Sequence, residues 1–295
     1  LVDRQPKHSY HAFTFAKEAH PAHRLEPIMT SASTKVPATS AEARAEFREN
    51  RLAQPTSGMA PGSVQANLAI LPRESAFEFL LFCQRNPKPC PVIEVIEAGS
   101  VEPSISAPGA DIRTDLPRYR VYRDGVMTEE LLDLKSIWRD DLVSFLLGCS
   151  FSFEHALLDN GITLPHWETD KNVAMFQTNV QTTPAGPFSG PMVVSMRWIP
   201  QDKVVRAVQA TTRFPNTHGA PVHVGNPEAI GVADPMKPDF GDAWEPQSSS
   251  DVPVFWACGV TPQAVAMASK PPLMITHAPG HMFLTDIKDE DLAVL

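Results

Sequence analysis

The sequence predicts an α/β protein with a mixed sheet, built as a single domain. Three observations predict this class. Of the 295 residues, 43% are hydrophobic and 20% are charged, a balance that supports one substantial core. From about residue 41 onward, apolar residues recur at helical spacing in some segments and at strand-like spacing in others. The 29 prolines are spread along the chain, which is typical of many ordered connections between short elements.

Residues 1–45 differ in composition from the rest of the chain. They hold four histidines and a stretch rich in Ser, Thr and Ala, and they lack a periodic apolar face. We therefore expect a poorly ordered N-terminal extension over residues 1–45 and the α/β domain over residues 46–295. Met29 fits a start codon, and the acidic residues before it argue against a mitochondrial targeting peptide. The cytoplasm is the expected location, with the mitochondrion as the alternative.

The first half of the domain is expected to alternate helices with short strands. Helical spacing and terminating residues predict helices over residues 41–52, 73–85, 136–147 and 153–160. Residues 64–70 form an apolar segment, and residues 92–96 are predicted to form a strand. Asp124-Gly125 predicts a hairpin that joins strands over residues 119–122 and 126–128.

The second half is expected to be richer in strands. A helix is predicted over residues 202–211, and strands are predicted over residues 192–198, 222–224, 252–257, 273–277 and 282–286. Pro279-Gly280 predicts a tight turn between the last two strands.

Charge and hydropathy exclude several classes of partner. The net charge of −9 argues against nucleic acid or an anionic membrane as the main partner. No apolar run reaches the roughly 18–20 residues needed to cross a bilayer. The four cysteines lack the C-x-x-C spacing of metal sites, and the phosphate and dinucleotide loops of common cofactor folds are missing. We expect the substrate to be a small-molecule carboxylate, and we assign neither a cofactor nor a metal. The protein could also form a homo-oligomer.

The segment over residues 252–262 predicts a carboxylate site. A buried strand runs into Cys258 and Gly259, and Thr261-Pro262 fits the start of a helix, with threonine as N-cap. Free backbone N–H groups at such a helix start bind anions. Cys258, Gly259 and Thr261 are therefore candidate substrate-binding residues, and a well-capped surface helix is the alternative.

A second helix start follows Gly148. Ser152 is expected to cap this helix, which places Cys149 and Ser150 just before its first turn. Since a thiol at a helix N-terminus can have a lowered pKa, Cys149 is a candidate nucleophile. Ser150 and Ser152 are candidate substrate-binding residues. The alternative is that these small residues serve only in packing.

Histidines and carboxylates of the C-terminal half supply candidate acid–base groups. His223 is expected inside a short strand, and Asp239 and Asp242 follow it in a loop-rich segment. A histidine titrates near neutral pH, so His223 with either aspartate could manage protons. His277, beside the predicted Pro279-Gly280 turn, is a candidate substrate-binding residue. Structural roles are the alternative for each of these side chains.

Two arginines are candidates for holding a carboxylate. The guanidinium group binds a carboxylate with two parallel hydrogen bonds. Arg113 lies in an Arg- and Asp-rich segment, and Arg197 ends a hydrophobic strand. The alternative is a set of structural ion pairs, with Arg113 and Asp115 as the expected internal pair.

Several long segments resemble the D-glutamate cyclase, or hydro-lyase, family. They are TSGMAPGSVQAN (56–67), FCQRNPKPCP (82–91), DIRTDLPRYR (111–120), GCSFSFE (148–154), GPMVVSMR (190–197), HGAPVHVG (218–225) and VPVFWACGVTP (252–262). The similarity covers roughly residues 41–286. The resemblance implies an α/β fold of two interlocked lobes without an obligatory organic cofactor. It also implies cyclisation of D-glutamate to 5-oxo-D-proline with loss of water.

The expected function is therefore that of a hydro-lyase for a small amino acid or related carboxylate. Ring closure needs an amine held near a γ-carboxyl group, a base and an acid. One alternative is a non-catalytic protein that binds an acidic metabolite. Another is a metal-assisted hydratase or hydrolase that uses His218, His223 and His277.

Overall fold

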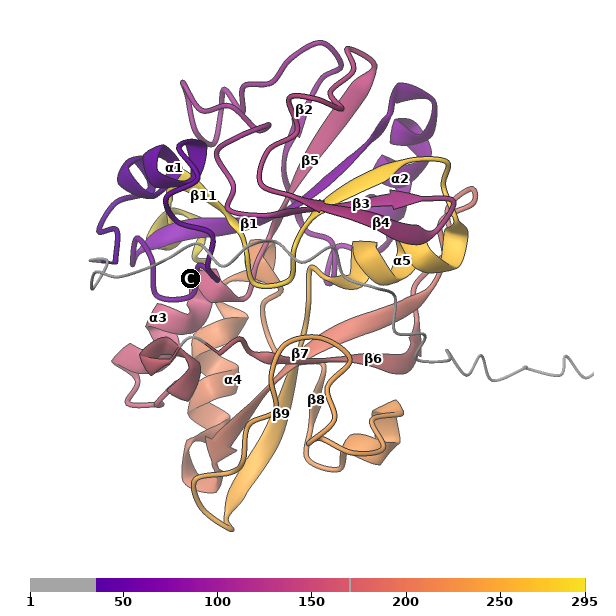
Figure 1. Ribbon diagram of the computed structural model, residues 1–295. Helices are drawn as coiled ribbons and strands as arrows, with labels where there is room; N and C mark the ends of the chain where they lie inside the picture. Colours follow the sequence, from indigo (N-terminus) through magenta and orange to yellow (C-terminus); the bar gives the residue numbers. More distant parts are fainter. Residues whose placement is uncertain (1–35, 170, 295) are drawn as a thin grey trace, which may run out of the picture. The chain divides into compact units, whose positions relative to one another are not determined.

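Two antiparallel sheets organise the chain (Figure 1). The structure, a computed structural model, describes residues 36–169 and 171–294, and the residues from Val36 onward form one unit. Of the expected N-terminal extension, residues 1–35 lie outside the described part, whereas residues 36–45 belong to the folded unit and enter its first helix, α1 (Ser40–Arg48). The α/β class expected from the sequence is confirmed.

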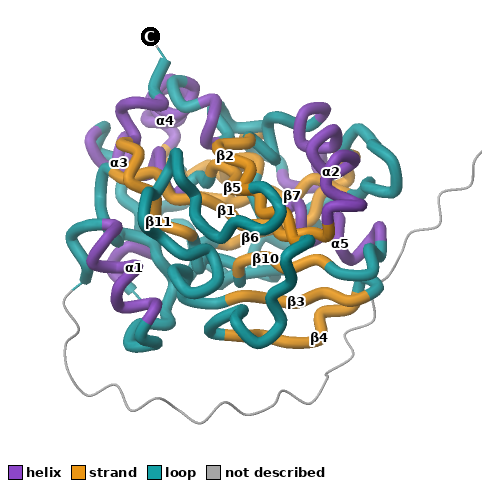
Figure 2. The backbone as a smooth tube through the Cα atoms, turned by 90° about the horizontal axis from the view of Figure 1, so that it is seen from above, coloured by secondary structure: helices purple, strands orange, loops and turns teal. Residues whose placement is uncertain are grey.

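The larger sheet has seven strands in the order β2-β5-β1-β10-β3-β4, with β11 also pairing with β1. The strands are β1 (Ser63–Pro72), β2 (Val92–Ile96), β3 (Tyr119–Arg123), β4 (Val126–Leu131), β5 (Leu142–Gly148), β10 (Met274–His277) and β11 (Phe283–Lys288). Strand β1 lies at its centre and is buried along its whole length. Figure 2 shows β1 between β5 and β10 when the molecule is viewed from above.

The smaller sheet has four strands in the order β6-β7-β9-β8. These are β6 (Ala174–Gln181), β7 (Pro191–Pro200), β8 (His223–Val224) and β9 (Asp251–Ala257). All strand pairings of the described residues are antiparallel, whereas the sequence analysis expected a mixed sheet. The helices between the strands therefore do not serve as the crossovers that parallel neighbours require.

One predicted helix is wrong. Residues 136–147 were expected to be helical, but the structure has strand β5 over Leu142–Gly148, paired with β1 on one side and β2 on the other. All seven residues of β5 are buried, so the strand reads as a continuous apolar run without alternation. Such a run cannot be distinguished from a buried helix by periodicity alone. Strand β6 was not predicted.

The remaining helices are α2 (Arg73–Arg85), α3 (Phe151–Asp159), α4 (Val204–Thr212) and α5 (Thr261–Ser269), with α2 bounded as predicted. Three of these helices lie within two residues of their predicted bounds, and α5 begins within one residue of the helix start predicted at Thr261-Pro262. Helix α1 carries a capping box in which Thr39 and Glu42 satisfy each other's backbone amides. It is tied to β11 by Arg44, whose guanidinium donates to the Leu284 carbonyl oxygen at 2.7 Å. Among the described residues, no helix is long and apolar enough to cross a membrane.

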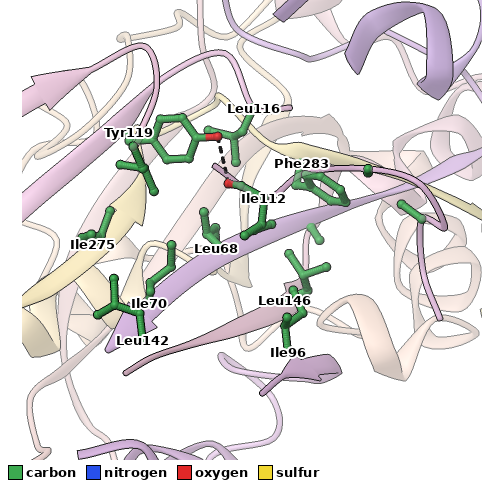
Figure 3. Packing of buried hydrophobic residues seen from close by; sticks show 14 of the residues in the cluster. Leu68, Ile70, Ile96, Ile112, Leu116, Tyr119, Leu142, Leu146, Ile275 and Phe283 are labelled. Carbon is green, nitrogen blue, oxygen red and sulfur yellow. Dashed lines mark hydrogen bonds between the residues drawn. The ribbon is translucent and has the colours of Figure 1, made fainter. Parts of the chain in front are cut away.

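The larger sheet is covered by apolar side chains on both faces. Successive residues of a strand point to opposite faces, and Leu68 and Ile70 of β1 enter one cluster while Ala69 and Leu71 enter another. In the first cluster (Figure 3), the Tyr119 hydroxyl donates to the Ile112 carbonyl oxygen at 3.0 Å. This hydrogen bond satisfies the polar end of an otherwise apolar, fully buried side chain.

Helix α5 joins the two sheets. The Thr261 hydroxyl accepts a hydrogen bond from the Val193 amide of β7 at 3.0 Å. The Gln263 side chain donates to the His277 carbonyl oxygen of β10 at 2.9 Å. Because both side chains are fully buried, these bonds fix the first turn of α5 against both sheets.

The approach of α5 to the larger sheet generates a stability prediction. A Cβ atom at Gly259 would lie 1.9 Å from Nδ2 of Asn67, whose amide is held by the Gly148 carbonyl oxygen at 2.6 Å. We expect Gly259→Ala to lower the free energy of unfolding by about 1–3 kcal/mol because of this overlap. Urea unfolding measures the loss.

The matched control is Gly190→Ala, where the nearest atom to the added Cβ is 3.3 Å away. Gly190→Ala should lower the free energy of unfolding by less than Gly259→Ala does. Adding Asn67→Ala to Gly259→Ala should give a smaller loss than the sum of the single changes, since the overlap is then gone. Additive losses would contradict the close approach.

Candidate functional site

A charged group lies fully buried in the first turn of α3, the carboxylate of Glu154. It is 0% exposed and accepts hydrogen bonds from Arg197 Nε at 3.1 Å, from His166 Nε2 at 2.8 Å and from Trp167 Nε1 at 2.5 Å. Arg197 Nη2 also donates to it. These donors come from β7 and from the short 3-10 helix η1 (Pro165–Glu168), so one carboxylate ties three elements together.

Arg197 holds the other half of the buried ion pair. Its guanidinium also donates to the hydroxyl oxygens of Ser150 at 3.2 Å and of Ser195 at 3.1 Å. The group lies over the aromatic rings of Phe153 and Trp256, with its central carbon 5.7 and 5.4 Å from their centroids. Hydrogen bonds and cation–π contacts together offset the cost of removing the charge from water.

The protonation state of Glu154 follows from these contacts. Burial alone would raise the pKa of the carboxyl group, but the neighbouring His166 and Arg197 side chains and the hydrogen bonds that the carboxylate accepts lower it to about 2. The side chain is therefore an ionised acceptor at neutral pH.

A small cavity lies beside this cluster. Its volume is about 30 Å³, which is room for roughly two water molecules. Arg197, His166 and Glu245 contribute charged or titratable groups to its wall, and Trp198 and Trp244 contribute aromatic surface. The complete lining is Thr163, Leu164, Pro165, His166, Val173, Met196, Arg197, Trp198, Trp244, Glu245 and Gln247. A cation, a carboxylate and an imidazole thus border one cavity.

The predicted residues at the start of α3 lie close to this cluster but differ in role. Ser150 occupies the N-cap position and receives the hydrogen bond from Arg197 rather than capping the helix. Ser152 lies inside α3, where its hydroxyl accepts from the Gln65 amide of β1 at 3.0 Å. Cys149 is buried, and burial raises the pKa of its thiol well above the ordinary value. This geometry favours a neutral packing residue over a nucleophile at Cys149.

The expected carboxylate cradle at the start of α5 is filled by protein. Thr261 is the first residue of the helix and not its N-cap, and its hydroxyl donates to the Cys258 carbonyl oxygen at 2.7 Å. Asn67 lies against Gly259, and its amide donates to the Gly148 carbonyl oxygen at 2.6 Å. Burial raises the pKa of Cys258 to about 11. The structure gives these residues contacts that hold α5 in place.

The predicted acid–base set is not brought together by its hydrogen bonds. The His223 ring donates from Nε2 to the Asn226 carbonyl oxygen at 2.7 Å. Asp239 accepts from the Gln177 amide at 2.8 Å, and Asp242 accepts from the Asn172 amide at 2.7 Å. None of the three lines the cavity described above. Each carboxylate instead holds a backbone amide of the segment around β6.

Arg113 and His277 also have structural partners. Arg113 forms its ion pair with Asp111 at 2.7 Å and not with Asp115, which instead pairs with Arg48. His277 is 1% exposed, and its Nδ1 accepts from the Leu68 amide at 3.2 Å. Of the predicted site residues, Arg197 alone lines the cavity. Ser150 does not line it, but its hydroxyl oxygen accepts a hydrogen bond from Arg197.

Sequence reasoning missed most of the groups that border the cavity. Glu154, His166, Trp244 and Glu245 were not among the candidate site residues. The sequence offered one signal. Glu154 lies in the apolar start of a helix, and the dipeptide His166-Trp167 follows shortly after that helix. No group of three or more His, Cys, Asp and Glu side chains in the described ranges is arranged to hold a metal ion.

Comparison with known proteins places the chain in a family. A family model described as D-glutamate cyclase matches residues 143–286. A protein named "Putative hydro-lyase" in Geobacillus kaustophilus is 61% identical over 259 residues, which cover 88% of this chain and 98% of that protein. The chain belongs to the D-glutamate cyclase family. All residues that line the cavity, together with Glu154, fall inside the segment that matches this family.

Other members of the D-glutamate cyclase family are similarly close. "Putative hydro-lyase YcsI" of Bacillus subtilis is 59% identical over 86% of this chain and 98% of its own length. A "Putative hydro-lyase" of Stutzerimonas stutzeri is 60% identical over 85% of this chain and 95% of its own length. The matches therefore extend over nearly the whole of these relatives.

Two buried histidines generate a prediction about pH. Burial lowers the pKa of His218 to about 4 and that of His277 to about 3, while an exposed histidine titrates near about 6.5. The unfolded chain therefore binds protons at a higher pH than the folded chain. The stability that the neutral rings contribute is complete above about pH 6.5 and is lost as the pH falls toward 4 and below.

We expect the free energy of unfolding to fall between pH 6.5 and 4 by up to about 1.4 kcal/mol per pH unit for each of these histidines. Urea unfolding at a series of pH values measures the slope. His277→Gln should reduce the slope, whereas the exposed-site change His155→Gln should not. Equal slopes in the wild type and His277→Gln would show that burial of His277 has no such effect.

Proposed function

We propose that the chain is a hydro-lyase for a small acidic amino acid, and that D-glutamate closes to 5-oxo-D-proline with release of water. The observation that carries the proposal is the wall of the cavity, where Arg197, Glu245 and His166 border one space. A guanidinium suits a carboxylate, and a carboxylate suits an ammonium group. The pattern thus complements a carboxylate and the ammonium group of an amino acid. Membership of the D-glutamate cyclase family supports the same reaction.

The proposed reaction is balanced without an external reactant. The α-nitrogen of D-glutamate attacks the γ-carboxyl carbon, so that one C–N bond forms and one C–O bond breaks. The ammonium group loses two protons in becoming an amide N–H, and both leave with the departing oxygen as water. Catalysis therefore needs positioning, electrostatic stabilisation and a group that moves protons.

The side chains of the cavity suit these needs. Arg197 is held rigidly by Glu154, Ser150 and Ser195, so it can favour a substrate carboxylate without reorganising. Trp198 and Trp244 supply walls that exclude water. Since the cavity holds only about two waters, glutamate must widen it. Trp244 lies in residues 242–246, which have no regular secondary structure, and we expect that segment to move on binding.

A protein that binds an acidic metabolite without turnover is the second candidate. The observation that favours it is that Arg197 and Glu245 border the cavity, since these two groups can hold the carboxylate and the ammonium group of an amino acid without performing a reaction. It predicts that 5-oxo-D-proline or D-glutamate raises the melting temperature while neither is converted.

Turnover of D-glutamate tests the proposal directly. Purified full-length protein is incubated with D-glutamate, and 5-oxoproline is quantified by chromatography against a protein-free control. We expect product to accumulate in proportion to protein concentration. Thermal stabilisation by D-glutamate without product would favour the binding protein, and neither effect would remove D-glutamate from both proposals.

A conservative change at Arg197 tests the site of the reaction. Arg197→Lys keeps the charge but loses the planar fork, so we expect kcat/KM for D-glutamate to fall about 10- to 100-fold. The control is Arg139→Lys, since Arg139 forms an exposed ion pair with Asp141 away from the cavity. Circular dichroism checks that both variants are folded. Equal kcat/KM values for the two folded variants would place the reaction elsewhere.

A further inference from the structure

We infer that His166 is the catalytic residue that moves protons in this reaction, and that Glu154 is a positioning residue that orients its imidazole ring. The inference rests on the proposed function and assigns its acid–base group. It differs from the expectation drawn from the sequence, which gave this role to His223 with Asp239 or Asp242.

The hydrogen bond between the two side chains determines the tautomer of His166. Its Nε2 lies 2.8 Å from Oε1 of Glu154. An ionised carboxylate can only accept a hydrogen bond, so Nε2 must carry the proton. In the neutral ring the lone pair is then at Nδ1. A carboxylate that fixes the tautomer of a histidine in this way is the arrangement by which enzymes orient a general base.

Nδ1, the ring nitrogen of His166 that does not bind Glu154, is part of a side chain that lines the cavity. His166 lines the cavity, and its Nδ1 has no hydrogen-bond partner among the residues that the structure describes. The ring stacks on Phe151 with centroids 6.3 Å apart and an interplanar angle of 27°. Trp244 packs edge-on against it, also at 6.3 Å. Phe151 and Glu154 restrict the imidazole to one orientation.

Other histidines of the described chain are less suited to this role. His218 donates from Nδ1 to the Lys88 carbonyl oxygen, and His277 accepts from the Leu68 amide. His223 donates to the Asn226 carbonyl oxygen. None of these three histidines lines the cavity that Arg197 and Glu245 border.

One imidazole suffices for both proton transfers. Nδ1 of His166 first takes a proton from the ammonium group, which frees the lone pair of the nitrogen for attack on the γ-carboxyl carbon. It then gives that proton to a carboxyl oxygen. A second proton follows the same route from nitrogen to oxygen, and the C–O bond breaks as water leaves. Glu154 stays ionised throughout and stabilises the imidazolium each time it forms.

The test compares His166→Gln with the wild type after turnover has been established. A glutamine amide can still donate a hydrogen bond to Glu154 but has no titratable nitrogen. We expect kcat to fall by at least about 100-fold with little change in KM, because the lost group acts in the transition state. The matched control is His155→Gln, an exposed histidine of α3, which should keep wild-type kcat.

Two further measurements separate chemistry from structure. Added imidazole should restore turnover to His166→Ala in a saturable manner, which a purely structural role would not produce. In ¹⁵N spectra of the wild type, the histidine signal that disappears in His166→Gln should report a proton on Nε2. These spectra test the orientation of the ring even without a substrate.

The possible failures are distinguishable. A wild type that converts no acidic amino acid overturns the proposed function, whatever the variants do. An active wild type with a folded His166→Gln that keeps more than about a tenth of kcat overturns the assignment of His166 alone. A neutral His166 ring protonated on Nδ1 overturns the positioning role of Glu154.

Discussion

A single buried carboxylate constrains the structure around the cavity. Glu154 has no contact with solvent, and an isolated charge in that position would cost several kcal/mol. Its ionised form is stable only because Arg197, His166 and Trp167 donate hydrogen bonds to it. Three elements that are distant in the sequence must therefore meet: the first turn of α3, the short helix η1 and strand β7. Arg197 and His166, two donors of this cluster, border the cavity, so the interaction that supports the fold also supplies the chemical groups.

The same dependence explains why the candidate site is rigid on one side. Arg197 is held by a carboxylate, two hydroxyl groups and two aromatic rings. His166 is held by Glu154 and by the ring of Phe151. The wall also includes Trp244, in a segment without regular secondary structure. A fixed set of charged groups beside an aromatic wall that can adapt is suited to binding a small substrate and then excluding water from it.

Local signals predicted the fold well where neighbouring residues determine the structure. The bounds of α2 follow from its amphipathic spacing and from Asn86-Pro87 after it, and the β3–β4 hairpin follows from Asp124-Gly125. The prediction failed at β5, because burial on both faces removes the alternation that marks a strand. The antiparallel arrangement of the sheets also depends on long-range pairing, such as that of β1 with β10, which has no local signal.

The candidate site was less accessible to sequence reasoning for the same physical reason. Arg197 was recognised because an arginine at the end of an apolar strand is unusual. Glu154 looked like an ordinary first-turn acidic residue, since its burial depends on packing against β7 and η1. His223, Asp239 and Asp242 looked catalytic by composition, yet each holds a backbone group. Residue type indicates which chemistry is available, whereas tertiary contacts decide which groups are free to perform it.

The most direct test of this account is a crystal structure of the full-length protein with 5-oxo-D-proline bound. The account predicts ligand density beside His166 and Arg197, with Nδ1 of His166 within hydrogen-bond distance of the ring nitrogen or carbonyl group and Trp244 displaced. Density at another place, such as the start of α5 near Thr261, with the Glu154 cluster unchanged and its cavity still closed, would contradict it.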